Sequence, residues 1–341
     1  MRIAAIVLFL ATALMPAPAS ATQAGEASAE MILGWINQYR LRPEPHRVPE
    51  AIRTAGRFNA FKDPESAGVY VGFLAGVLNA NPTRAEAIIE KILPLPPDQQ
   101  WIVVRAIAWS GLPHWKGLLD GFKMHMPSRA TMIGMYLSGK LATLDQLDVT
   151  VDDPSFLQRI FSRDDEEKKQ KPGKLTPTTD VLDAYWGFYF ATGAFEPVAK
   201  LVSVLPWSTD NDDVERLTLG GMAKYTLATN AARNPELLKM LKWTARYQDK
   251  KTAKVLEEVV LAAETSDSAR IRKEALGAIE DLKRKGPGYK RKIAGWGQIG
   301  QGALSLGCIG AAVAGAVALG LPCVIGGAVS SAALNAWAAQ E

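Results

Sequence analysis

The sequence predicts an all-α fold, with helical hairpins in an α-solenoid-like body and an apolar, Gly/Ala-rich helical hairpin at the C-terminal end. From Glu26 to about Lys285, apolar residues recur every three or four positions, as they do along the buried face of a helix. Pro, Gly, Asn and Asp separate these segments, and hardly any stretch alternates apolar and polar residues as a half-buried strand does.

The expected helices have both this periodicity and suitable end signals. Asn81-Pro82 and Asn234-Pro235 each place a capping residue before a proline that suits the first helical turn. In order, the expected helices are Ala27–Arg40, Glu65–Asn79, Thr83–Leu93, Asp98–Trp109, His114–Lys123, Ser128–Ser138, Pro154–Phe161, Thr179–Thr192, Glu196–Val204, Asn211–Ala228, Pro235–Gln248, Thr252–Ala263 and Asp267–Lys283.

Composition excludes several classes of protein. The chain has 341 residues, of which 48% are hydrophobic and 22% are charged, and it contains two cysteines. These values exclude a disulfide-stapled miniprotein, a polytopic transporter and a disordered chain. Without Arg2 and the six basic residues at 283–292, the net charge of +4 becomes −3, so the helical body is near neutral and nucleic-acid binding is not expected, despite that basic cluster.

The first 21 residues have the pattern of a secretory signal peptide. Arg2 precedes an uncharged stretch at 3–15, and Ala19-Ser20-Ala21 is the small-x-small pattern that signal peptidase accepts. An uncleaved anchor is the alternative, but Pro16 interrupts the run before the roughly 20 apolar residues that a bilayer requires. We therefore expect export, to the periplasm or cell envelope of a Gram-negative bacterium.

Two helix pairs resemble each other and indicate an internal duplication. In each pair, a helix with aromatic residues and glycine leads through a proline into a second helix that ends at Leu-Pro: Tyr70–Gly76, Pro82 and Leu93-Pro94 in the first pair, and Tyr185–Gly193, Pro197 and Leu205-Pro206 in the second. Glycine inside the first helix allows a neighbouring helix to approach closely, as in helix-pair repeats. Two unrelated hairpins are the alternative.

The segment Tyr185 to Pro197 resembles a motif of uncharacterised exported helical proteins of Gram-negative bacteria. The resemblance covers only these residues, points to no named family and implies no activity. The ordered Trp, Leu-Gly and Tyr positions of tetratricopeptide repeats do not recur in the chain.

A charged stretch separates the two halves. Nine of the twelve residues at 163–174 are charged and the segment contains Pro172-Gly173, a composition typical of an exposed linker. The sequence therefore predicts five parts: the signal peptide 1–21, an N-terminal helical half 22–162, a charged linker 163–178, a C-terminal helical half 179–285, and a basic hinge with an apolar Gly-rich tail 286–341.

The tail differs abruptly from the rest of the chain. Ile293 to Gln340 is a run of 48 residues without a charged side chain. Gly302–Leu321 would be about 30 Å long as a helix, which matches the hydrocarbon thickness of a bilayer. We expect this tail to associate with a membrane, with anionic head groups contacting the basic residues before it: Lys283, Arg284, Lys285, Lys290, Arg291 and Lys292.

Several arrangements of the tail remain open. A single span would leave the basic residues on the exported side, against the usual charge bias, whereas a membrane hairpin returns both ends to that side. The alternatives to membrane association are a buried core hairpin of a soluble helical fold, a flexible glycine-rich tail and an oligomer contact.

Cys308 and Cys323 are candidate partners in a disulfide, because export favours oxidation. In one unbroken helix they would lie about 22 Å apart, far beyond the roughly 4.4–6.8 Å between the Cα atoms of a disulfide. A bridge within the chain therefore requires a turn near Gly315. A turn at Gly320–Pro322 leaves the thiols free or paired between chains.

No catalytic motif is recognisable. The nucleophile elbow, the phosphate-binding loop and the zinc helix are all absent from the sequence. Met124, His125 and Met126 offer copper-type ligands, but consecutive residues converge only on an extended backbone, so packing is expected. Asp152-Asp153 and Asp212-Asp213 are typical of helix caps. Core packing is expected for most of the tryptophans Trp101, Trp109, Trp115, Trp186, Trp207 and Trp243.

These expectations describe a non-enzymatic bacterial envelope protein with a helical interaction body and a membrane-associating tail. They include a membrane contact and a protein partner, and no catalytic, cofactor-binding or metal-ligating residue. The alternatives are a soluble periplasmic enzyme whose site is assembled only in the fold, and a secreted effector whose tail inserts into a membrane.

Overall fold

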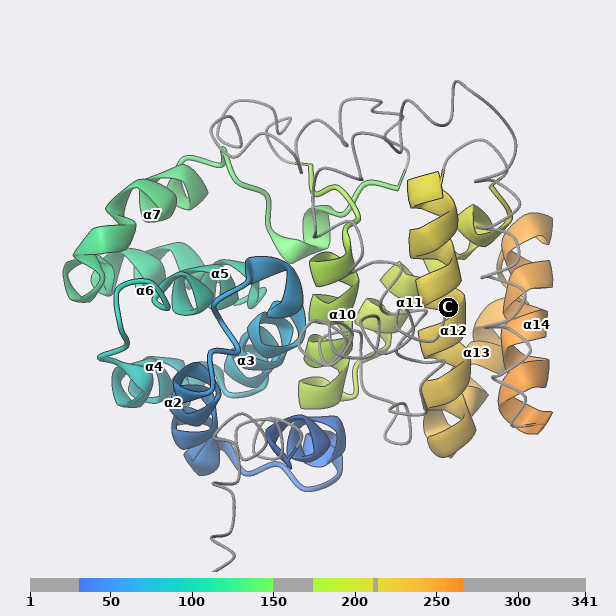
Figure 1. The fold of residues 1–341 in the computed structure, drawn as a ribbon, viewed down its shortest axis with the longest axis horizontal. Coiled ribbons are helices and arrows are strands. Elements are labelled where there is room, and N and C mark those ends of the chain that lie inside the picture. Colours follow the sequence, from blue (N-terminus) through green and yellow to red (C-terminus); the bar gives the residue numbers. More distant parts are fainter. Residues whose placement is uncertain (1–30, 150–173, 211–213, 266–341) are drawn as a thin grey trace, which may run out of the picture.

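The computed structural model describes residues 31–149, 174–210 and 214–265, and the named elements in these residues are all helical (Figure 1). Their β structure is limited to a bridge between Leu147 and Leu175. The predicted all-α class is therefore confirmed for this part of the chain. The signal segment 1–21, the helices expected at Pro154–Phe161 and Asp267–Lys283 and the apolar tail lie outside the described residues.

The elements form two groups along the chain. The first group, before residue 150, contains a helix over residues 31–38 and then η1 (Tyr39–Leu41), η2 (Pro45–Arg47), α2 (Val48–Arg57), η3 (Pro64–Ser66), α3 (Gly68–Ala80), η4 (Pro82–Arg84), α4 (Ala85–Ile92), α5 (Trp101–Trp109), α6 (Trp115–Gly121), η5 (Lys123–His125), η6 (Pro127–Arg129), α7 (Ala130–Leu137) and η7 (Leu144–Gln146). The second group contains α10 (Thr179–Thr192), α11 (Phe195–Ser203), η8 (Leu205–Thr209), α12 (Val214–Arg233), α13 (Pro235–Ala245) and α14 (Lys250–Thr265).

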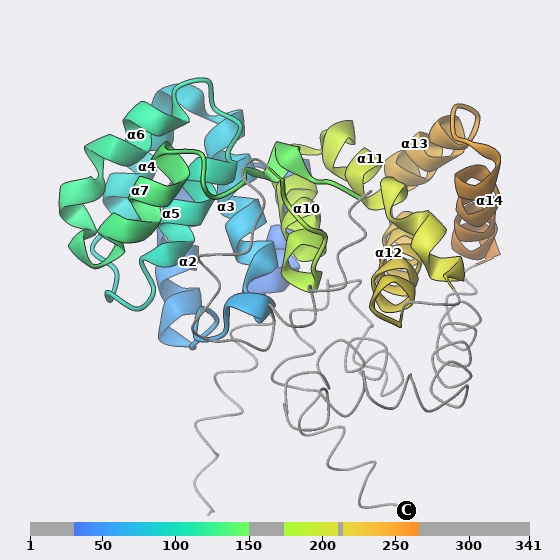
Figure 2. The same ribbon diagram turned by 90° about the horizontal axis from the view of Figure 1, so that it is seen from above.

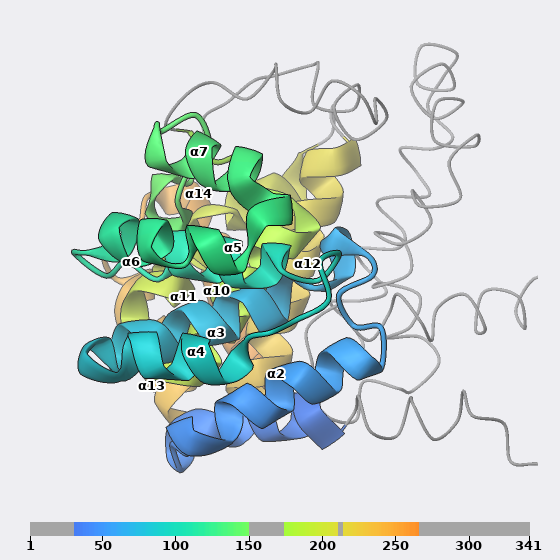
Figure 3. The ribbon, with the colours of Figure 1, turned by 90° about the vertical axis from the view of Figure 1, so that its left-hand side faces the viewer.

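The two groups meet at the centre of the molecule. The helices of the first group lie in successive layers, with α2 and the helix over residues 31–38 at one end and α7 at the other (Figure 3). α3 and α10 pack side by side, and α11 to α14 continue on the far side of α10 (Figures 1 and 2). Every residue from Gly68 to Leu78 of α3 is buried. Because α3 is apolar on all sides, it is stable only inside the protein.

Glycine allows α3 and α10 to pack closely. A Cβ atom added at Gly72 would lie 1.9 Å from the carbonyl oxygen of Ala184, and one added at Gly187 would lie 2.1 Å from the carbonyl oxygen of Val69. Real Cβ atoms do not approach backbone this closely, so neither glycine can be replaced without moving a helix.

These two contacts are reciprocal. Gly187 and Gly72 differ by 115 positions, and so do Ala184 and Val69, so each glycine packs against the residue three positions before the other. Gly76 likewise faces Ala191, which again lies 115 positions further along the chain. The matched motifs of the two halves therefore form one interface, with the register that a repeated helix would give.

Most helix ends follow from local sequence, with two corrections. Asn234 caps α13 as expected, because its side chain accepts hydrogen bonds from the backbone N–H groups of Glu236 and Leu237. Asn81 does not cap a helix; its amide instead donates back to the carbonyl of Val77. None of the expected helices covers residues 48–57, where α2 forms; its second residue is a proline, at a position where a missing N–H costs nothing.

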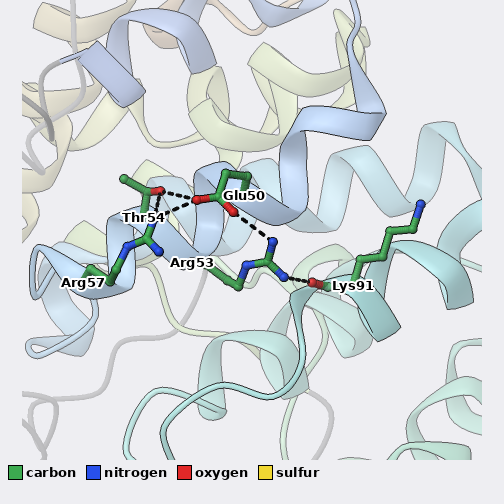
Figure 4. Close-up of polar contacts among 5 residues, drawn as sticks. All are labelled: Glu50, Arg53, Thr54, Arg57 and Lys91. Carbon is green, nitrogen blue, oxygen red and sulfur yellow. Dashed lines mark hydrogen bonds and ion pairs between the residues drawn. The ribbon is translucent and has the colours of Figure 1, made fainter.

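The outer face of α2 carries a network of ion pairs (Figure 4). Glu50 accepts hydrogen bonds from Arg53 at 2.8 Å, Arg57 at 2.7 Å and Thr54 at 3.2 Å. Arg53 also donates to the backbone carbonyl of Lys91, which ties α2 to α4. The hydrogen bonds from Arg53, Arg57 and Thr54 lower the pKa of Glu50 from its ordinary 4.5 to about 2.

The charge of Glu50 predicts a pH dependence. Because its folded pKa is depressed, its contribution to stability is fully present above about pH 4.5 and is lost as the pH falls through about 2. We expect the Glu50 carboxyl to titrate near pH 2 in a carbon-detected NMR titration. Arg53→Ala combined with Arg57→Ala should return the midpoint toward 4.5, and a wild-type midpoint already at 4.5 would contradict the network.

Candidate functional site

A cleft of about 560 Å³ lies where the two groups of helices meet. This volume is in the range of small-molecule sites. Five aromatic side chains contribute to its walls: Trp109, Trp115, Tyr136, Tyr185 and Phe188. Four charged side chains also line it: Lys116, Asp145, Glu196 and Lys200. Tyr185 and Phe188 belong to α10, and Glu196 and Lys200 belong to α11. The other five side chains come from the first group of helices.

One side of the cleft is the segment 139–146, which side chains hold in place. Trp109 donates its indole N–H to the carbonyl of Ala142 at 3.1 Å, and Tyr185 donates its hydroxyl to the carbonyl of Leu144. Lys200 donates to the carbonyl of Asp145 at 3.1 Å. These three bonds come from α5, α10 and α11, so the cleft wall is fixed by both groups of helices.

The two tyrosines of the cleft stay protonated at neutral pH. Burial raises the pKa of Tyr185, and the carboxylates of Asp145 and Glu196 raise it further. Burial also raises the pKa of Tyr136, although the Arg105 guanidinium opposes this effect. Both phenols therefore keep their protons, which Tyr185 donates to the carbonyl of Leu144, and neither is poised as a base.

A partly buried ion pair joins the two groups behind the cleft. Arg105 of α5 lies 3.3 Å from the carboxylate of Asp180 in α10, with side-chain exposures of 24% and 17%. Its guanidinium also lies over the rings of Trp101 and Trp109, at 5.1 and 5.2 Å from their centroids. Cation–π contact favours this position of the charge, so Arg105 orients Trp109 in the cleft wall.

The lining of the cleft offers groups that can bind a ligand. Aromatic faces can stack on a planar or apolar ligand, and the charges of both signs can orient its polar ends. No histidine lines the cleft. Within the described ranges, no three His, Cys, Asp or Glu side chains are grouped as a metal site would require.

The site residues expected from the sequence lie outside the described ranges. They are Cys308 and Cys323, the candidate disulfide, and the basic residues Lys283, Arg284, Lys285, Lys290, Arg291 and Lys292. In residues 31–149, 174–210 and 214–265, the helices lack the combined length and apolar character needed to cross a bilayer.

The methionines beside His125 do not converge. Met124 is 86% exposed, whereas Met126 is fully buried, so their sulfur atoms cannot serve one ion together with His125. This agrees with the packing expected for Met126. Trp101, Trp109 and Trp186 are buried as expected, but Trp243 is 54% exposed and does not belong to the core.

Sequence reasoning did not find the cleft. Its lining extends from Asn79 to Lys200, and these residues carry no motif spacing that would group them. Two weaker signals were present: Pro113 and Gly111 mark a loop beside Trp115, and Glu196 and Lys200 are one helical turn apart on α11. Only the fold brings these positions together.

The chain matches no known protein family, and no curated protein or solved structure is significantly similar to it.

Proposed function

We propose that this chain is a non-enzymatic exported envelope protein, with a solenoid-like helical body that binds a partner and an apolar C-terminal hairpin that holds it to a membrane. The observation that carries this proposal is the run of 48 uncharged residues from Ile293 to Gln340, directly after six basic residues within ten positions. A long uncharged run next to a basic cluster has the composition of a membrane element with a contact to anionic head groups.

The N-terminal pattern and the helical body support the same proposal. Residues 1–21 have the composition of a secretory signal, which is consistent with a bacterial envelope location. The body presents a cleft and long helical faces, as helix-pair proteins that bind partners do. We also propose that Cys308 and Cys323 form a disulfide, that the two helix pairs arose by duplication and that the tail forms a hairpin.

Fractionation of cell envelopes tests the proposal. The full chain and a version ending at Lys292 are each washed with high salt and then with alkaline carbonate. We expect the full chain to stay with the membranes through both washes, because burial of apolar side chains is insensitive to salt. The shortened chain should be released. Release of both forms by salt alone would remove the membrane role.

The cleft favours a second candidate function, a site for a small ligand. It brings Lys116, Asp145, Glu196 and Lys200 together beside an aromatic wall, as the alternative of a periplasmic enzyme with a fold-assembled site requires. A thermal-shift screen of small molecules tests it. A compound that stabilises the wild type, but not the variant Glu196→Ala with Lys116→Ala, would support it, and the absence of any such compound would count against it.

A further inference from the structure

Three aromatic side chains form an exposed cluster on the second group of helices. Phe195, Trp243 and Tyr247 are 37%, 54% and 69% exposed. The rings of Phe195 and Trp243 are 6.0 Å apart, and those of Trp243 and Tyr247 are 4.7 Å apart. Adjacent exposed aromatic side chains indicate an interaction surface, whereas single ones do not. We call these three residues the aromatic face.

Polar atoms of the aromatic face are free to bind. Among the residues that the structure describes, none forms a hydrogen bond with the indole N–H of Trp243 or with the hydroxyl of Tyr247. Trp243 and Tyr247 therefore each have an apolar body and a polar tip that faces solvent, whereas Phe195 is wholly apolar. This combination is typical of aromatic residues at a membrane–water interface.

The segment that carries Trp243 and Tyr247 and leads into α14 is basic, although α13 and α14 as a whole, residues 235–265, carry a net charge of only +1. Residues 239–254 contain six basic side chains and one acidic side chain, which gives a local charge of +5. The acidic residue, Asp249, caps α14, and its hydrogen bonds from Thr252 lower its pKa. Lys239 and Arg246 are exposed and lie four positions before and three positions after Trp243. Lys242 pairs with Glu264, so one of these charges is partly neutralised.

We propose that the aromatic face rests on the head-group layer of an anionic membrane. Trp243, Tyr247 and Phe195 would insert to the depth of the head groups, and Lys239 and Arg246 would contact lipid phosphates. We choose an anionic membrane as the partner because of charge complementarity: the basic side chains near Trp243 and Tyr247 are attracted to anionic lipid. Tryptophan and tyrosine are also enriched at the membrane–water interface.

This inference rests on the proposed function, since the tail would hold the body at the same membrane. α14 ends at Thr265 and the uncharged run begins at Ile293, so 27 residues separate them. With the helix expected at Asp267–Lys283, this segment spans up to about 60 Å, of which the ten remaining residues contribute about 34 Å when extended. The body can therefore lie on the bilayer that the tail enters.

Hydroxyl-radical footprinting of the full chain tests the inference, with and without vesicles of phosphatidylethanolamine and phosphatidylglycerol. We expect oxidation of Trp243 and Tyr247 to fall severalfold in the vesicle-bound protein. Met124, which is 86% exposed and lies between α6 and α7, is the internal control and should be oxidised equally in both states.

Full-length variants provide a second readout. Trp243→Ser with Tyr247→Ser should weaken partition into these vesicles about tenfold, because two aromatic contacts with the interface are lost. Met124→Ser is the matched control and should leave partition unchanged.

The outcomes separate the two proposals. If the full chain sediments with vesicles but Trp243 and Tyr247 are oxidised as in free protein, the aromatic face is not a membrane contact, and an acidic protein becomes its expected partner. If the full chain does not bind vesicles at all, the proposed membrane role fails, and this inference fails with it.

Discussion

Gly72→Ala is expected to lower the free energy of unfolding by about 3 kcal/mol, near the upper end for overpacking in a core. The added methyl group would lie 1.9 Å from the carbonyl oxygen of Ala184, and neither α3 nor α10 can move without disturbing the packing around it. Urea denaturation followed by circular dichroism measures this loss. Gly187→Ala should have a similar effect, because its contact with Val69 is the reciprocal one.

Gly134→Ala is the matched control for this substitution. Gly134 lies inside α7, and an added Cβ atom meets nothing within 4 Å. Alanine there should stabilise the protein by about 0.5–1 kcal/mol, since it reduces the freedom of the unfolded chain. Equal effects of Gly72→Ala and Gly134→Ala would contradict the close packing of α3 on α10.

Trp186→Ala is expected to cost about 3–5 kcal/mol of stability, as removal of a large buried ring does. Trp186 is 1% exposed, and its ring stacks on that of Phe190 with centroids 5.7 Å apart. Its indole N–H donates to the hydroxyl of Thr226 at 3.0 Å, which links α10 to α12. The substitution therefore removes packing and a hydrogen bond between α10 and α12.

Trp243→Ala provides the contrast for this prediction. Because Trp243 is 54% exposed, its removal should change the free energy of unfolding by no more than about 0.5 kcal/mol. Both variants are compared by urea denaturation at equal protein concentration. A loss at Trp243 as large as that at Trp186 would place Trp243 in the core and remove the aromatic face.

Where local signals were strong, the sequence predicted helices well. The expected helix Thr179–Thr192 has the same bounds as α10. The helix ends there because Gly193 adopts the left-handed conformation. α12 continues five residues beyond the predicted end at Ala228, through Thr229 and Asn230. Their side chains bond to carbonyls of the preceding turn, so they are accommodated inside the helix rather than ending it.

Other features depended on contacts that one sequence does not show. The glycines of the two matched motifs predicted close helix packing, but not that Gly72 and Gly187 would meet in one interface. The cleft depends on residues from Asn79 to Lys200 that only the fold brings together. The body as a whole is near neutral, so its total charge does not reveal the local charge of +5 at residues 239–254. The basic side chains near Trp243 are therefore not predicted from the net charge.

The central claim is that the uncharged run from Ile293 to Gln340 lies in lipid. Cys308 and Cys323 fall within this run, so after reduction each can carry a nitroxide spin label, with the other cysteine replaced by serine. In vesicle-bound protein, the claim predicts frequent collisions of the label with oxygen, which dissolves in hydrocarbon, and few with a water-soluble nickel chelate. Infrequent collisions with both reagents would mean that protein surrounds the run, and frequent collisions with the nickel chelate would mean that water does; either result would contradict the claim.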